Sequence, residues 1–453
     1  MNLLKKYILV TVVMAIAPIA SAQTLHSLYF LEGNNQRNTL NPAFTSERGF
    51  VTFPALGNLS ISANSNIGLG TFMTPRGNEM VTFMHESISN EDALSKFKKN
   101  NIIEANVDLN IITVGFNAWN GTNTIGLSVR SRTGAYLPKT LFSFLKEGQN
   151  MSGVTEYDFS DVAAKTMNYV ELALGHARKI NDKLSVGAKL KILVGGAYAE
   201  AHADDVKITM SGDRWMISQK SSLVGSKGLN FVTDNTGEIT KVDFDNFGVA
   251  GYGGALDLGA VYKINPETTV SLAVTDIGFI SWNDCSTATN KNSTFEFKGF
   301  DNIAEDDNPD GSNSFDDAAD EVLDNLKGLV KYHDDGKKGK TTSLYTTVRA
   351  AGEYALLNNR ISFGLLASMR FGAPKVWSEA MLTANFRPSR WFNAAINGSV
   401  SNVRSSVGAV INFHPKAMNF FIGGDYLLAK FGKQFIPVNA AKLNIGLGLS
   451  FNF

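Results

Sequence analysis

Apolar and polar side chains alternate strictly along the last twelve residues of the chain, 442–453. Lysine, asparagine, glycine and serine fill the positions between six apolar residues, which are Leu443, Ile445, Leu447, Leu449, Phe451 and Phe453. Successive side chains of a β-strand point to opposite faces, so this pattern predicts a strand with one apolar and one polar face. Its length fits a tilted membrane strand of ~9–11 residues. A soluble β-sandwich strand could alternate similarly, but it would rarely be so long or end the chain on an aromatic residue.

The same alternation recurs at 184–194, 361–371 and 392–400. Charged side chains on the second face of such strands are costly in lipid, so that face should line the lumen of a barrel. The residues expected to face the lumen are Lys183, Lys189, Lys191, Asp257 and Arg370. The pattern therefore predicts a membrane barrel with a polar interior.

Short turns and longer connections alternate along the chain. The expected turns, rich in residues that favour turns, are 120–123, 181–182, 265–267, 358–359, 388–389 and 414–416. The connections between them are 71–104, 136–167, 199–251, 282–342 and 430–439, with tight ones near 372–375 and 403. This asymmetry is typical of outer-membrane barrels, which have short periplasmic turns and longer outside loops.

These connections predict an all-β fold, a transmembrane antiparallel barrel of about fourteen strands, an even number as in bacterial barrels. The barrel should span 58–453, with its first strand near 58–70 and short helices in its loops. A hairpin over 202–221 or a short strand at 50–56 would change the strand number.

Residues 1–22 have the pattern of a secretory signal peptide. Lys5 and Lys6 precede an apolar stretch, and 20–22 (Ala-Ser-Ala) give the small-x-small pattern of a cleavage site. The alternative is an N-terminal membrane anchor, but the apolar stretch is shorter than the ~20 residues that a spanning helix needs. We expect cleavage before Gln23 and export to the cell outer membrane.

The segment 23–57 precedes the first expected strand. It contains apolar residues around 26–31 and again at 40–44, where Asn41-Pro42 favours a turn. These apolar residues need a surface that buries them. The segment is therefore expected either to plug the lumen or to pack at the periplasmic rim.

Composition narrows the remaining possibilities. No stretch beyond the signal peptide reaches the ~18 apolar residues of a membrane helix, so a membrane protein of this sequence must be a closed barrel. With 42 basic and 42 acidic residues, the charge gives no reason to expect nucleic acid as a partner. Cys285 is the single cysteine, which excludes an intrachain disulfide framework and a cysteine-based metal cage. It could be a reactive thiol, but a lone loop residue is the simpler interpretation.

Candidate chemistry is sparse. Within the acidic run 301–320, Asp306, Asn308 and Asp310 match the start of a calcium loop, but Asp317 stands where such loops place glutamate. A solvated acidic loop is the alternative, and no other cofactor is expected. No histidine pair has metal-ligand spacing and no hydrolase motif is present, so the chain is expected not to be an enzyme. A barrel-borne hydrolase, assembled from residues distant in sequence, is a third interpretation.

Two short helices are expected in the loops, at 138–146 and 320–332. The second has an apolar stripe, which consists of Val322, Leu323, Leu326, Leu329 and Val330. This stripe could pack onto the barrel mouth or bind a partner.

Two sequence blocks resemble a known family. The segments 40–44 (LNPAF), 47–51 (ERGFV) and 53–59 (FPALGNL), and the later block 171–190, resemble an uncharacterised outer-membrane family of Bacteroidetes, domain of unknown function 5723. The early Asn-Pro-Ala is also similar to that of FadL-type transporters of hydrophobic compounds and of some barrels of the type IX secretion system. The closer resemblance implies fold and location, and it carries no assigned activity or site residues.

The sequence therefore predicts an outer-membrane barrel that transports small molecules, hydrophobic ones included, in the manner of FadL. The alternative is a structural barrel whose long loops dock other envelope proteins. Expected partners are outer-membrane lipid, the transported ligand or an envelope protein. The barrel-assembly machinery is also expected, because Phe451 and Phe453 resemble its terminal aromatic signal.

Overall fold

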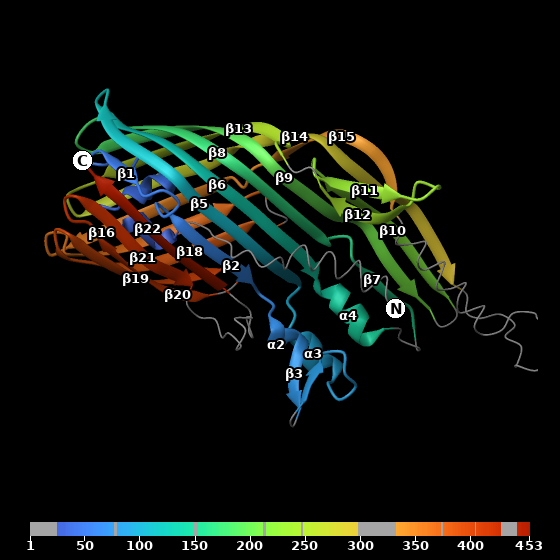
Figure 1. Ribbon diagram of the computed structural model, residues 1–453. Coiled ribbons are helices and arrows are strands. Elements are labelled where there is room, and N and C mark those ends of the chain that lie inside the picture. Colours follow the sequence, from blue (N-terminus) through green and yellow to red (C-terminus); the bar gives the residue numbers. More distant parts are fainter. Residues whose placement is uncertain are drawn as a thin grey trace, which may run out of the picture.

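The computed structural model describes residues 25–76, 79–148, 153–211, 214–245, 248–297, 332–372, 375–403, 405–426 and 442–453. They form a closed antiparallel barrel (Figure 1). Its fourteen strands among these residues are β2 (Leu59–Ser65), β5 (Asn100–Ala118), β6 (Gly121–Pro138), β8 (Ala163–Lys179), β9 (Leu184–Met210), β13 (Gly251–Lys263), β14 (Thr268–Phe297), β16 (Thr347–Leu356), β17 (Ile361–Arg370), β18 (Trp377–Ser389), β19 (Phe392–Ser401), β20 (Ser406–Phe413), β21 (Met418–Tyr426) and β22 (Lys442–Asn452). The predicted fold class and strand number are confirmed.

The last strand closes the barrel onto the first. β22 pairs with β2 through Leu59 and Leu447, and β2 pairs with β5. A short strand, β1 (Phe50–Thr52), continues the same ladder, with Val51 opposite Phe451. The first strand is thus interrupted over 53–58, where Ala55 has a positive φ of 60°. The predicted single strand at 58–70 is therefore too long.

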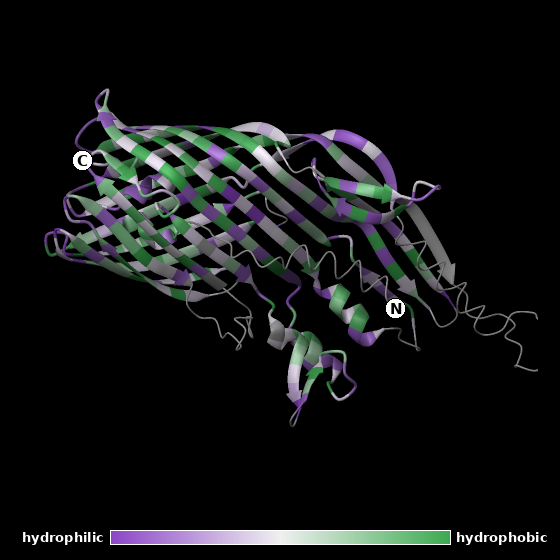
Figure 2. Ribbon diagram, viewed as in Figure 1, coloured by the Kyte–Doolittle hydropathy of each residue, from purple (hydrophilic) through white to green (hydrophobic). Residues whose placement is uncertain are grey.

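Side chains alternate between the two faces of the wall, as Figure 2 shows by its checkered colouring. In β17, Phe363 and Leu365 are about half exposed on the outer face, whereas Ser362 and Arg370 are buried inside. Continuous apolar surface of this kind marks contact with a membrane. The structure is that of a transmembrane barrel with a polar interior.

Six short turns lie at one end of the barrel, which we call the turn end; the chain terminus Phe453 lies there too (Figure 1). The turn between β5 and β6 consists of Trp119 and Asn120, both with positive φ, which is the geometry of a tight hairpin. It begins one residue before the predicted position. The turn between β18 and β19 lies at 390–391 and not at 388–389, because β18 continues to Ser389.

At the opposite end, the strands β9 and β14 extend far beyond the others, over 27 and 30 residues. Their extensions pair with β10 (Trp215–Gly225), β7 (Thr155–Asp158) and β15 (His333–Ser343). The predicted loops 199–251 and 282–342 are thus wrong in part. Polar residues occupy both faces of these extensions, so the alternation that marks a membrane strand is missing from their sequence.

Short elements complete this end. A hairpin is formed by β11 (Leu229–Thr233) and β12 (Ile239–Phe244). A small cap consists of α2 (Leu69–Phe72), β3 (Met73–Arg76), β4 (Glu79–Thr82), α3 (Asn90–Ser95) and α4 (Lys139–Glu147). The cap packs around aromatic rings, with Phe97 stacked on Phe142 at 4.0 Å between centroids. α4 confirms the predicted helix at 138–146, whereas 320–331 lie outside the described residues.

None of the helices in the described ranges is both long enough and apolar enough to cross a membrane.

Candidate functional site: the barrel interior and its N-terminal plug

Residues 25–44, here called the plug, lie inside the barrel toward the turn end. Two 3₁₀ turns, η1 (His26–Phe30) and η2 (Asn35–Thr39), make up half of it. Its apolar side chains are almost fully buried; they are Leu25, Leu28, Tyr29, Phe30, Leu31 and Leu40. They pack against the inward-facing Leu366, Met381, Ala395, Val410 and Phe421 of five different strands. The barrel wall thus buries apolar residues that the plug cannot bury by itself.

Glycines on the inner wall make room for the plug. A Cβ atom at Gly187 would lie 2.1 Å from the carbonyl oxygen of Pro42, and one at Gly446 would lie 2.9 Å from Cγ of Leu25. At Gly364, a Cβ would contact the ring of Phe30 at 2.8 Å. The plug therefore fits closely against β9, β17 and β22.

Side chains of the wall hold the plug by its backbone carbonyl groups. Arg387 donates to Phe30 O at 3.0 Å, Asn393 to Glu32 O at 2.7 Å, and Asn419 to Gly33 O at 3.0 Å. On the other side, Lys189 Nζ donates to Asn38 O at 2.6 Å. Each such bond contributes a net ~0.5–1.5 kcal/mol, so the plug is held firmly but reversibly.

His414, in the turn between β20 and β21, packs against Gly33 of the plug. Burial lowers the pKa of His414, and the nearby carboxylate of Glu32 opposes this change only in part. The imidazole is therefore neutral at pH 7 and adds no charge to the rim of the barrel.

Two buried carboxylates receive the first described residues of the plug, Leu25 to Ser27, here called the plug tip. Asp425 accepts the backbone N–H groups of His26 and Ser27, the second at 3.1 Å. Glu379 lies 2.9 Å from Nδ1 of His26. Asn397 and Asn444 also donate to Asp425, at 3.4 and 3.5 Å. We call Glu379 and Asp425 the carboxylate pair.

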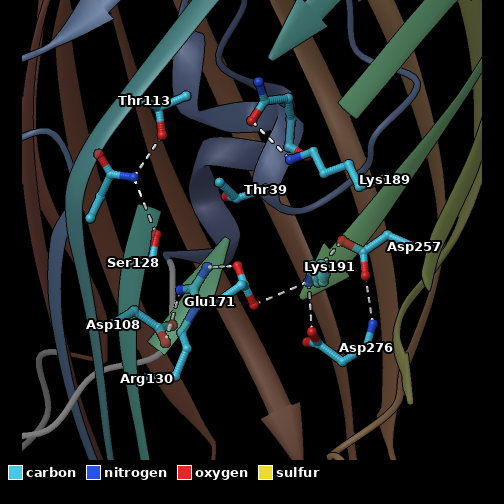
Figure 3. Close-up of polar contacts among 12 residues, drawn as sticks. Thr39, Asp108, Thr113, Ser128, Arg130, Glu171, Lys189, Lys191, Asp257 and Asp276 are labelled. Atoms are coloured by element: carbon cyan, nitrogen blue, oxygen red, sulfur yellow. Dashed lines mark hydrogen bonds and ion pairs between the residues drawn. The ribbon is translucent and has the colours of Figure 1, made fainter. Parts of the chain in front are cut away.

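A ladder of alternating charges crosses the opposite wall, from β5 to β14 (Figure 3). Its members are Asp108, Arg130, Arg132, Glu171, Lys191, Asp257 and Asp276. Lys191 Nζ lies 2.8 Å from Asp257 and 2.6 Å from Asp276, and 3.5 Å from Glu171. Buried charges are tolerated only when they are paired, and every member of this ladder has an opposite charge within 3.5 Å.

A separate ion pair lies nearer the cap. Arg370 donates to Glu104 at 2.7 Å, and its guanidinium lies 5.4 Å from the ring of Trp377 and 5.7 Å from that of Tyr345. The interior beyond the plug thus contains paired charges and aromatic rings.

Four of the five residues expected in the lumen, Lys189, Lys191, Asp257 and Arg370, have buried side chains inside the barrel. Lys183 directly precedes the first residue of β9. It lies exposed in the turn before β9, because Asn181 Oδ1 accepts the N–H groups of Lys183 and Leu184 and so ends the turn there. The lumen-facing position of Lys183 stays a prediction.

The other candidate residues lie as follows. Asp306, Asn308 and Asp310 lie outside the described residues; within those residues, no group of three or more potential ligands could hold a metal. Cys285 is fully buried in β14, next to Asp284 with its positive φ, and does not lie in a loop as predicted.

The terminal aromatic residues lie at the turn end. Phe451 is 42% exposed on the outer face, and its ring contacts Phe53 at 6.4 Å between centroids. Phe453 is 70% exposed. Their role as an assembly signal stays a prediction.

The chain belongs to a family of unknown function, DUF5723, whose model matches residues 42–425. No match was found among curated proteins. Among solved structures, the chain is similar to the toluene transporter TbuX of Ralstonia pickettii, with 9% identity, a TM-score of 0.45, and 92% of this chain and 94% of that chain covered. It is also similar to the toluene transporter TodX of Pseudomonas putida, with 9% identity, a TM-score of 0.40, and 96% of this chain and 95% of that chain covered. A FadL homologue of Pseudomonas aeruginosa is similar too, with 10% identity, a TM-score of 0.36, and 93% of this chain and 94% of that chain covered.

Proposed function

We propose that this protein is an outer-membrane barrel that transports small molecules and is gated by its plug. The observation that carries the proposal is the plug itself. It fills the turn end of the barrel, and hydrogen bonds, apolar contacts and the ion pair of Arg387 with Glu32 at 3.7 Å hold it there among the described residues. A barrel with a purely structural role does not need a plug in its interior that can be released.

The apolar outer surface and the leader-like residues 1–22 support placement in the outer membrane. Leu382, Ile396 and Val400 are each more than half exposed on the outer face, where water would be a poor solvent for them. The terminal Phe453 supports recognition by the barrel-assembly machinery. In this orientation the turn end faces the periplasm.

A docking barrel is the second candidate. The observation that favours it is the size of the part beyond the apolar belt, where β9 and β14 extend and the cap exposes Met80 and Met84 by 53% and 52%. Such methionine side chains adapt well to a protein partner. Transport remains the first candidate because docking does not require the plug.

A disulfide across Leu25 and Gly446 tests the gate. A Cβ at position 446 would lie 2.9 Å from Cγ of Leu25, so cysteines at both positions can bond with little backbone movement. We expect the oxidised L25C/G446C variant, in a C285A background, to stop solute entry into liposomes. Reduction should restore entry to the level of the C285A protein.

The L25C single variant is the control and should respond neither to oxidant nor to reductant. Equal solute entry with the disulfide formed would show that the plug is not a gate. No entry in any protein, including the unmodified one, would contradict the transport function itself.

A further inference from the structure

The carboxylate pair lies in a polar wall of amide and hydroxyl groups. Around it, the inner faces of β18 to β22 carry Asn385, Asn397, Ser399, Ser406 and Asn444, each buried. Among the described residues, no lysine or arginine forms an ion pair with Asp425. The interior cations that form ion pairs do so with other acids, in the charge ladder and in the pairs Arg370–Glu104 and Arg387–Glu353. Among the described residues, hydrogen-bond donors thus hold Asp425.

The plug tip satisfies these carboxylates with donors only. Backbone N–H groups bond Asp425 and an imidazole bonds Glu379. A buried carboxylate is costly without donors or a positive charge, so whatever replaces the plug tip must supply the same groups. The site therefore selects for a ligand that donates several hydrogen bonds and carries a positive charge.

Two further polar atoms at this site are buried and have no hydrogen-bond partner among the described residues. The first is Oδ1 of Asn397, the residue whose Nδ2 donates to Asp425. The second is Nε1 of Trp377, whose ring lies 5.6 Å from that of His26. Both side chains are more than nine-tenths buried. An ammonium group has three N–H donors, which Glu379, Asp425 and Oδ1 of Asn397 could accept. The ring of Trp377 already lies 5.4 Å from one cation, the guanidinium of Arg370, which shows that a positive charge is accommodated beside it.

We propose that Glu379 and Asp425 form a binding site for small primary amines, and that the plug tip occupies this site while the barrel is closed. The proposal rests on the proposed transport function and gives it a substrate class. An amine that enters competes with His26 for the carboxylate pair and so favours release of the plug tip. Uncharged molecules of equal size lack the charge that the pair requires.

Entry of three sugars of one shape into liposomes tests the proposal. Glucosamine carries a charged amine, glucose is neutral, and glucuronate is an anion. We expect the unmodified protein to admit glucosamine fastest and glucuronate slowest. D425N and E379Q should each reduce the ratio of glucosamine to glucose entry about tenfold, equivalent to ~1.4 kcal/mol.

N419A is the matched control, because Asn419 holds the plug at Gly33 and does not contact the carboxylate pair. It should raise the entry of all three sugars and keep the preference for glucosamine. Heat-modifiable migration on a gel verifies that each variant is folded.

The outcomes separate the two proposals. If N419A and the unmodified protein admit all three sugars equally, the amine site is wrong and transport stands. If D425N and E379Q keep the full preference, the amine site is also wrong. If no sugar enters through any folded variant, the transport function fails.

Discussion

Replacement of Lys191 by methionine is expected to destabilise the barrel by about 3–5 kcal/mol, because it leaves buried acids without their cation. Lys191 contacts Asp257, Asp276 and Glu171 at once, all within 3.5 Å. Methionine has a similar length and fills the same space, so the lost charge dominates the effect. The free energy of unfolding, measured by urea titration of the protein in bilayers, provides the test.

Lys183→Met is the matched control. Lys183 is exposed in the turn before the same strand, so its replacement should change stability by no more than about 0.5 kcal/mol. Equal losses for the two variants would mean that the charge ladder does not stabilise the barrel. A loss confined to K191M would locate the stabilisation in the buried contacts.

Gly187→Val is expected to push the plug out of place and to raise solute entry severalfold. A Cβ at this position would lie 2.1 Å from Pro42 O and 2.6 Å from Ala43 N. Backbone atoms cannot move aside as a flexible side chain could, so the plug must shift. Overpacking of this kind costs about 1–3 kcal/mol, which is less than the barrel as a whole is expected to lose with K191M.

Gly352→Val serves as the control for this variant. Gly352 lies on the outer face of β16, and a Cβ there meets no atom within 4 Å. It should leave both solute entry and stability unchanged. If folded G187V admits solute no faster than the unmodified protein, the close fit of the plug is contradicted.

The sequence predicted the parts of the fold that depend on local pattern. The alternation in 442–453 defined the closing strand, and Asn, Gly and Pro marked turns such as 265–267. Both signals arise within a few residues, because strand period and turn geometry are local properties. The strand number followed from counting such turns.

The interior could not be predicted in the same way. Alternation indicated that Lys191 faces inward, but its partners Asp257 and Asp276 come from other strands, 66 and 85 residues away along the chain. The carboxylate pair was missed altogether, although Asp425 and Glu379 each occupy a polar position in an alternating strand, which was the available signal. The extension of β14 was missed, and that of β9 was given only as an alternative, the hairpin over 202–221, because strands with two polar faces lack a distinctive period.

The contacts between plug and wall have a consequence for assembly. Asn35 bonds Asn452, 417 residues further along, and β1 pairs with β22 across nearly the whole chain. Pairing between such distant segments makes folding slow. Leu25 lies against Gly446 and Asn35 bonds Asn452, so the seat of the plug is complete only once β22 has closed the ring. The plug is therefore expected to settle in the last stage of folding, after β22 has paired with β2.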